Sequence, residues 1–335
     1  MRAFGHTRPT ALEEPDALQS FDLPVPEPGP QDLLVSVKAV SVNPVDAKMR
    51  TRPLPEAEAP RILGWDAAGV VEAVGAAVTG FRPGDAVYYA GDLTRQGSNA
   101  AYQTVDARIA AKKPESLGFA EAAALPLTAI TAWEMLFDRL GFAEGGGGGE
   151  TLLMVGAAGG VGSIAIQLAR ALTEREVIAT ASRPETQDWV RSLGAQHVVS
   201  HAAPFAEAVR AIVRGGVDAV FSANASDQHL AQIVESLRPQ GRFGLIDDPE
   251  SFDIMALKRK SISLHWEFMF TRSMFATPDL AKQGGLLARL ADLVDSGRVK
   301  TTVGQHLGTL SLETLREAHA LLESGRAKGK LVLEV

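Results

Sequence analysis

The stretch TLLMVGAAGGVGSIAIQLARAL, residues 151–172, decides the fold of this 335-residue chain. An apolar run at 151–155 leads into a glycine-rich corner, and the spacing of apolar residues over 160–172 predicts a helix. Within the corner, Ala157, Gly159 and Gly162 form a small-x-G-x-x-G pattern. Such residues permit a tight turn, close approach of a pyrophosphate and close packing of the helix on its strand. The stretch therefore predicts a dinucleotide site.

The residues expected to surround the phosphates are those of the corner itself. The N-terminus of the following helix adds unpaired N–H groups and the positive end of its dipole. The alternative is a glycine-rich turn without a ligand, which the strand before it and the helix after it make less favourable. We expect backbone contacts from Gly156, Ala157, Ala158, Gly159, Gly160, Val161 and Gly162.

The character of the chain changes near residue 125. Strands and amphipathic helices alternate afterwards, which predicts a doubly wound parallel sheet over 125–269 and an α/β fold class. Residues 1–124 instead hold short Val- and Ala-rich segments separated by Pro and Gly, typical of an antiparallel or barrel-like β unit. The final helix and strand do not continue the alternation, so we expect 270–335 to complete the first domain.

Composition excludes several classes of function. The formal net charge is −7, so no broad positive field is available for nucleic acid or anionic lipid. No apolar run approaches the ~20 residues that cross a bilayer, and the first residues lack the apolar core of a signal peptide. We therefore expect a cytoplasmic protein with no nucleic-acid or membrane partner. The chain has no cysteine, which removes disulfides and any thiolate nucleophile or metal ligand.

The end of the second strand indicates which dinucleotide is bound. Folds that prefer NAD place an Asp or Glu there, about 20 residues after the corner, to bind the ribose hydroxyls. Here the segment IATASRPET carries Ser182 and Arg183 instead. A hydroxyl and a guanidinium receive a 2′-phosphate that a carboxylate would repel. NADPH is therefore the expected cofactor, the alternative being that Arg183 is a solvated loop residue.

Taken together, several stretches resemble the medium-chain dehydrogenase/reductase superfamily over nearly the whole chain. They are SVNPVDAKMR (41–50), LGWDAAGVVEAVGAAVTGFRPGDAVYY (63–89), LPLTAITAWEML (125–136), VGAAGGVG (155–162) and GKLVLEV (329–335). The chain is most similar to the zinc-free quinone oxidoreductase branch, close to zinc-type alcohol dehydrogenase-like proteins. The resemblance implies a GroES-like β-barrel catalytic domain, a Rossmann domain inserted into it, and a cleft between them for the nicotinamide.

The residues themselves argue against a catalytic zinc. Metal-dependent relatives carry a Cys in the segment matching 41–46 and a His at the position of Trp65, and neither is present. A zinc site needs three N, O or S ligands around an open position, so we expect no metal. Without a Lewis acid an alkoxide is hard to stabilise, whereas a conjugated acceptor spreads its developing charge toward oxygen. We therefore expect hydride transfer from NADPH to a quinone or an α,β-unsaturated carbonyl, with protonation from a side chain or water.

Further site residues are implied by the resemblance. Asn43 and Asp46 match residues that line the nicotinamide cleft. Lys48 stands where zinc-free relatives often carry a Tyr and would supply a hydrogen-bond donor if it faces the cleft, the alternative being a solvated turn lysine. Trp65 and Tyr89 are candidates for the pocket wall, with core packing as the alternative. For His201, which matches a Tyr near the adenosine phosphate, a surface loop histidine is the alternative. The expected cofactor contacts are Thr128, Ser182, Arg183, His201, Asn224, Phe243, Leu245, Arg326 and Lys330.

The aromatic stretch SISLHWEFMFTRSMF (261–275) has three interpretations: a dimer-forming edge strand, an apolar substrate wall, or core. A long hydrophobic edge left unpaired is an aggregation liability, so a homodimer is expected. The alternative functions are a zinc-dependent alcohol dehydrogenase, an enoyl-thioester reductase, and a non-catalytic NADPH-binding sensor or RNA-associating protein. The acidic pI argues against RNA.

Overall fold

The computed structural model describes residues 1–54 and 60–335. The chain divides into two compact units, the first formed by residues 1–130 with 270–335 and the second by 131–269. The second unit is therefore a continuous insertion into a discontinuous first unit. Among the helices of the described residues, none combines the length and the apolar character needed to cross a membrane.

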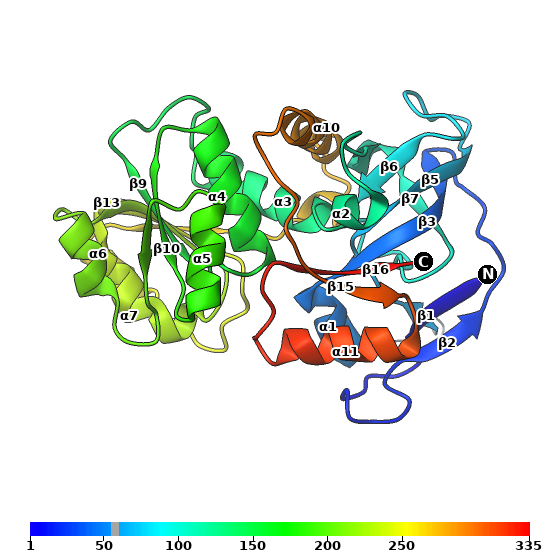
Figure 1. Cartoon of the computed structure of the whole chain (residues 1–335), viewed down its shortest axis with the longest axis horizontal. Coiled ribbons are helices and arrows are strands. Elements are labelled where there is room, and N and C mark those ends of the chain that lie inside the picture. The colour runs from blue at the N-terminus through cyan, green and yellow to red at the C-terminus, as the bar shows by residue number, and fades with distance from the viewer. Residues whose placement is uncertain (55–59) are drawn as a thin grey trace. The chain divides into compact units, whose positions relative to one another are not determined.

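The first unit is built on a largely antiparallel sheet with strand order β15-β16-β3-β5-β6-β8, and β7 also pairs with β3 (Figure 1). A smaller sheet has the order β2-β1-β4. The C-terminal strand returns to this unit as the sequence predicts, because Leu331 of β16 pairs antiparallel with Val42 of β3. The strands are β1 (Arg2–His6), β2 (Gln19–Asp22), β3 (Asp32–Val42), β4 (Arg61–Ile62), β5 (Ala67–Val74), β6 (Ala86–Tyr89), β7 (Tyr102–Asp106), β8 (Ala110–Lys112), β15 (Val303–Thr309) and β16 (Lys330–Glu334).

Short helices connect these strands. Pro44 begins α1, where its fixed φ suits a first helical turn, and Asp46 accepts a hydrogen bond from the Asn43 N–H at 2.8 Å. This local bond holds the 41–46 segment at the end of β3. The helices are α1 (Pro44–Thr51), α2 (Phe119–Ala123), α9 (Thr271–Met274), α10 (Lys282–Asp295) and α11 (Leu312–Glu323), with the 3₁₀ turn η2 (Ala107–Ile109). Helix α3 (Pro126–Trp133) begins in this unit and is followed by the π-helix η3 (Glu134–Arg139).

The second unit contains a parallel sheet with strand order β11-β10-β9-β12-β13-β14. Helices α4 and α5 lie beside one face of this sheet, and α6 and α7 lie beside the other (Figure 1). All five residues of the central strand β9 are buried, as expected for a parallel strand covered on both faces. The strands are β9 (Thr151–Val155), β10 (Glu176–Thr180), β11 (His197–Val199), β12 (Val217–Ser222), β13 (Leu237–Leu245) and β14 (Ser263–Trp266). The helices are α4 (Gly160–Leu172), α5 (Pro184–Ser192), α6 (Ala206–Ile212), α7 (Ser226–Ser236) and α8 (Met255–Lys258).

Candidate functional site

The glycine-rich corner lies between β9 and α4 in the second unit. The chain turns at Gly156, whose φ of +72° is a left-handed conformation that favours glycine. The sequence placed the tight turn at Ala157, one residue too late. Gly162 packs closely, because a Cβ there would lie 2.4 Å from the carbonyl oxygen of Ala157. This agrees with the role expected for the third small residue of the pattern.

Gly159 is not required by the packing of the protein itself. It is the N-cap of α4 with an ordinary φ of −74°, and a Cβ there would meet nothing nearer than the Gly156 carbonyl oxygen at 3.6 Å. Because Gly159 has no side chain, open space lies beside the first N–H groups of the 13-residue helix α4, and the packing of the protein does not account for this space. That space and those donors fit a dinucleotide pyrophosphate.

Polar side chains gather where β10 and β11 end, at one edge of the parallel sheet. Ser182 and Arg183 follow β10, and His201 follows β11. The Ser182 hydroxyl lies 3.4 Å from Nε2 of His201, so the structure brings these predicted residues together. Arg183 Nε donates to the Glu185 carboxylate at 3.0 Å. Both side chains of that ion pair are more than 40% exposed, and such surface pairs are weak enough to exchange for another anion.

A second histidine, which the sequence did not single out, joins this cluster. His229 lies in the first turns of α7, and its ring meets that of His201 edge-on with centroids 5.9 Å apart. Phe205 packs against the other side of the His229 ring at 5.5 Å. Burial lowers the pKa of both histidines, and the nearby His229 and Arg183 lower that of His201 further. Both rings are therefore neutral at neutral pH while the cluster holds no anion.

The remaining cofactor residues predicted in this unit are placed differently. Asn224 is exposed just after β12, at the carboxyl edge of the sheet where such folds bind ligands. Phe243 and Leu245 lie in the hydrophobic core and pair in the ladder with β12 and β14. Their side chains are therefore packing groups, and a side-chain contact with a ligand does not follow from this placement.

In the first unit, a buried polar network joins residues that are far apart in the chain. Asp66 is fully buried, and one of its carboxylate oxygens accepts from Lys330 Nζ at 3.0 Å and from the Asn43 amide at 2.9 Å. Its other oxygen accepts from the Leu127 N–H at 2.8 Å. Lys330 Nζ also donates to Asn43 Oδ1 and to the Val42 carbonyl. Burial raises the pKa of Asp66, and Lys330 opposes that increase.

This network corrects the role expected for Lys330. The resemblance implied that its ammonium reaches cofactor phosphates, but only 3% of the residue is exposed and Asp66 neutralises its charge. Arg326, expected to do the same, is exposed after α11. Lys330 is thus a structural counter-charge for Asp66, and no local signal in the sequence indicates this pairing.

The other residues predicted for catalysis are mostly enclosed. Asn43 and Asp46 are at most 1% exposed, and burial raises the pKa of Asp46 to about 7. Trp65 and Tyr89 have no exposed surface, and the Trp65 indole donates to the Asp92 carbonyl at 3.2 Å. This placement favours core packing over a pocket wall for both rings. Lys48 is the exposed member of the set, on α1.

Thr128, the cofactor contact expected near the nicotinamide, is also buried. Only 3% of the residue is exposed, and its hydroxyl donates to the Leu125 carbonyl one helical turn earlier at 3.2 Å. Its neighbour Leu127 supplies the N–H that binds Asp66. The LPLT segment is therefore tied to the buried network by its backbone.

An acidic pair in the second unit was not foreseen. Glu267, which follows β14, is 3% exposed and accepts from Arg139 Nε at 2.7 Å. Glu134, the first residue of η3, is fully buried. Burial and the neighbouring Glu134 raise the pKa of Glu267 to about 8, and Arg139 opposes this. The Glu267 carboxyl group therefore retains its proton at neutral pH.

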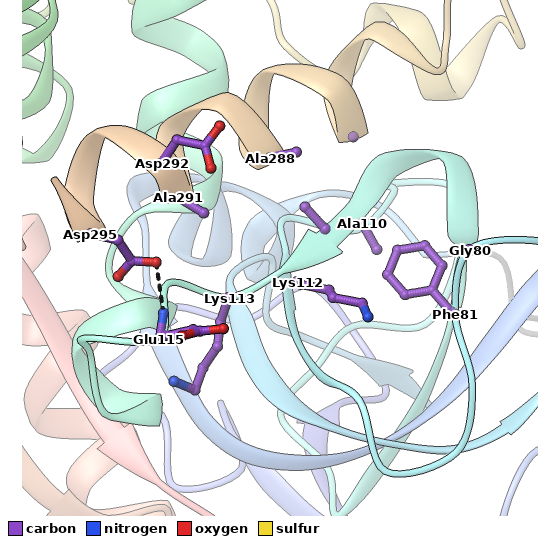
Figure 2. A pocket seen from close by; sticks show the side chains of 12 residues that line it. Gly80, Phe81, Ala110, Lys112, Lys113, Glu115, Ala288, Ala291, Asp292 and Asp295 are labelled. Atoms are coloured by element: carbon purple, nitrogen blue, oxygen red, sulfur yellow. Dashed lines mark hydrogen bonds between the residues drawn. The ribbon is translucent and has the colours of Figure 1, made fainter.

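A groove of about 380 Å³ in the first unit lies apart from the residues discussed above (Figure 2). It runs between α10 and β8 and is lined by Phe81, alanines and charged side chains. Asp295 accepts hydrogen bonds from the backbone N–H groups of Glu115 and Ser116, and Lys112 pairs with Asp85 at 3.3 Å. None of the predicted site residues lines it. We therefore do not assign the reaction to this groove.

Comparisons with known proteins agree with this architecture. The family described as alcohol dehydrogenase GroES-like domain matches residues 29–131, and the family described as zinc-binding dehydrogenase matches 193–333. The chain is 41% identical to a zinc-type alcohol dehydrogenase-like protein of Staphylococcus aureus (strain COL), with all of both chains covered. A 2-methylene-furan-3-one reductase of Solanum lycopersicum is 30% identical over 92% of this chain and 73% of its own.

A solved structure from Rhizobium etli CFN 42, described as a candidate zinc-dependent alcohol dehydrogenase, is also very similar. It is 52% identical, covers 100% of this chain and 98% of its own, and superposes with a TM-score of 0.96. The expected fold class is thereby confirmed, with a GroES-like domain and a Rossmann-like parallel-sheet domain.

These family descriptions mention zinc, but the residues described do not fit a zinc site. No group of three or more His, Cys, Asp or Glu residues within 1–54 and 60–335 is arranged to hold a metal ion. The oxygens of Asp66 already accept from an ammonium, an amide and a backbone N–H. Trp65, beside it, offers an N–H donor and no ligand atom. We therefore derive no step through zinc.

Proposed function

The chain belongs to the medium-chain dehydrogenase/reductase superfamily, and from that premise we propose that it is an NADPH-dependent reductase of quinones or α,β-unsaturated carbonyl compounds that works without zinc. Membership makes it an oxidoreductase on a nicotinamide-dinucleotide-binding fold. The choice of NADPH, the class of acceptor and the absence of zinc are parts of the proposal.

The choice of NADPH is supported by the Ser182–Arg183–His201 cluster. Ser182 and Arg183 offer a hydroxyl and a guanidinium at the end of β10, where NAD-preferring folds carry an acid, and His201 adds an imidazole from the end of β11. A phosphate with two negative charges would replace Glu185 as the partner of Arg183 and gain charge-assisted hydrogen bonds. When bound, the cofactor supplies a hydride at C4 of its nicotinamide.

The acceptor class is supported by the chemistry of the Asn43–Asp66–Lys330 network, which is the single observation that carries it. Its buried charges satisfy one another, so these residues offer no free ligand set for a Lewis acid that would stabilise an alkoxide. A conjugated acceptor needs only hydrogen-bond donors as its charge moves to oxygen. The name of the tomato relative describes such an acceptor, a methylene group conjugated to a ketone.

Lys48 is the proton donor we propose for the first unit. It is exposed on α1, the helix that Asn43 precedes, and its ammonium has three donor hydrogens. An enone that accepts hydride at its β-carbon becomes an enolate, which takes a proton from Lys48 or from water reached through it. Lys48→Arg keeps a donor and is expected to retain activity, whereas Lys48→Met is expected to lower kcat.

The test is oxidation of NADPH by the chelator-treated protein with a naphthoquinone, a short enone and a simple ketone compared in parallel. The proposal expects turnover of the quinone or enone only, surviving the chelator, with NADPH preferred to NADH. Ser182→Asp places a carboxylate beside the expected phosphate, so it should weaken the binding of NADPH but not the binding of NADH. Turnover of the ketone alone, lost on chelation, would refute the zinc-free mechanism.

We also propose a homodimer formed through β14. This strand is the edge of the parallel sheet, and Trp266 on it is 51% exposed with Phe268 close behind at 48%. Pairing two such edges antiparallel would cover apolar surface and complete backbone hydrogen bonds. Light scattering coupled to size exclusion tests this, and Trp266→Lys should give a monomer if β14 forms the interface.

A further inference from the structure

The His201–His229 pair has no explanation in the packing of the second unit alone. His201 Nδ1 is buried and has no hydrogen-bond partner among the described residues, although buried polar atoms are usually paired. The rings meet edge to face, a contact that two simple apolar side chains would make at lower cost. Two half-buried imidazoles beside Ser182 and Arg183 therefore suggest that a charged ligand completes the cluster.

Resting on the NADPH proposal, we propose that His201 and His229 together form a proton-dependent part of the 2′-phosphate site, so that the preference for NADPH over NADH increases as the pH falls. His229 is the new residue here, a specificity-determining side chain from α7 that acts on the phosphate with and through His201. Arg183 supplies a guanidinium charge beside His201.

The charged groups around the two histidines allow proton uptake to accompany phosphate binding. Arg183 and the opposing ring face His201, whereas Asp227 and Asp247 act on His229 from the start of α7 and the end of β13. Asp247 also binds the N–H and hydroxyl of Ser226, which holds this end of α7 in place. Burial lowers the pKa of both rings, and the two aspartates oppose this at His229. Neither ring lies so deep that it is unable to take a proton.

The direction of the effect follows from linkage. A phosphate dianion beside the rings favours the imidazolium form and raises their pKa values in the complex. The complex then binds more protons than the free protein, and affinity for NADPH increases as pH decreases through that range. Each unit of pKa increase corresponds to about a tenfold gain in affinity at low pH. NADH has no 2′-phosphate and gains nothing.

The experiment measures Kd for NADPH and NADH from pH 8.5 to 6.5. Phosphate monoesters take a second proton near pH 6, which acts in the opposite direction, so the range stops above that value. Calorimetry in two non-phosphate buffers of different ionisation enthalpy counts the protons taken up with each nucleotide. The variants are H201Q and H229Q, with H197Q as a matched control. His197 is on β11 and pairs with Glu176 at 2.7 Å, outside the cluster.

We expect the ratio of the NADH Kd to the NADPH Kd to increase by up to about fivefold across the range for one unit of pKa increase in total, short of the tenfold limit because the free rings have pKa values below 6.5. Proton uptake should accompany NADPH alone. H229Q should reduce the slope, H201Q should reduce it at least as much, and H197Q should leave it unchanged. Thermal melts of all four proteins show that the variants are folded.

Two other results would contradict the inference, and they are distinguishable. A strong NADPH preference with no pH dependence, or a slope that neither variant changes, overturns the role of the histidines while leaving NADPH as the cofactor. Tighter binding of NADH at every pH refutes the NADPH proposal itself, and the inference with it.

Discussion

Removing the Lys330 ammonium while keeping its apolar stem, as in Lys330→Met, tests the buried network directly. Asp66 would keep the Leu127 N–H and the Asn43 amide but lose the counter-charge that now lies 3.0 Å away. Both partners are at most 3% exposed, so water does not replace the ammonium. Breaking a buried pair by removing one partner costs about 3–5 kcal/mol. We expect the free energy of unfolding of the first unit to decrease by that amount.

A double-mutant cycle separates this charge effect from a simple packing defect. Asp66→Asn alone leaves Lys330 buried without its carboxylate and should also be strongly destabilising. The double variant lacks both members of this ion pair and should be more stable than the sum of the two single effects by about 2–3 kcal/mol.

The assay is hydrogen exchange measured by mass spectrometry in increasing urea, followed on peptides from β3 and β16. These peptides report the first unit alone, which matters because two-unit chains need not unfold in one step. A cost below about 1 kcal/mol for Lys330→Met, or additive single effects, would refute a buried ion pair at this place.

Three further perturbations test other parts of the structure. Burial lowers the pKa of His319 on α11 to about 3, so the unfolded chain binds more protons between about pH 6.5 and 3 and stability falls as the pH drops through that window. At pH 5 the neutral His319 lowers the free energy of unfolding by about 2 kcal/mol relative to pH 7.5. His319→Leu should therefore reduce the difference between the urea midpoints at pH 7.5 and pH 5. If that difference is unchanged in the variant, His319 is not the group responsible. Burial beside Glu134 raises the pKa of Glu267 to about 8, so stability is lost as the pH rises above the ordinary carboxyl value and through 8. In thermal melts, the stability of Glu267→Gln relative to the wild type should therefore be at least about 1 kcal/mol more favourable at pH 9 than at pH 5. A variant that is equally destabilised at both pH values would contradict the raised pKa. Gly162→Ala forces a Cβ to within 2.4 Å of the Ala157 carbonyl and should cost about 1–3 kcal/mol, whereas Gly159→Ala should leave the melting temperature unchanged and weaken dinucleotide binding in fluorescence titrations. Equal melting temperatures for these two variants would mean that the close contact at Gly162 is relieved without strain.

Local sequence signals predicted the elements of the second unit well. The helix expected over 160–172 has those bounds, because its apolar spacing and the glycine corner act within a few residues. The same local signals placed Ser182 and Arg183 at the end of the second strand, whereas His201 was implied by the family resemblance. The structure brings Ser182 and His201 together because the carboxyl ends of parallel strands meet at one edge of the sheet. Gly156 and Ala157 were confused because either small residue suits the turn until backbone φ is known.

What the sequence did not predict depends on contacts between distant segments. Lys330 and Asp66 are 264 positions apart, and nothing in either local pattern indicates that β16 and the end of β3 bring them together. His229 escaped notice because a histidine on a helix is usually solvated, and only the fold places it against His201. Trp65 and Tyr89 were ambiguous for a related reason, because an aromatic after a strand suits a pocket wall as well as a core.

The pairing of Lys330 with Asp66 also sets an order of events during synthesis. A ribosome adding about 5–20 residues per second needs roughly 10–50 s to travel the 264 positions between them. Until then, the nascent first unit holds an acid without its counter-charge and a β3 edge without β16. The inserted unit is continuous and is complete on emergence of residue 269. The unit that begins first is thus the last to be completed, because its closing strand is made only after the whole inserted unit.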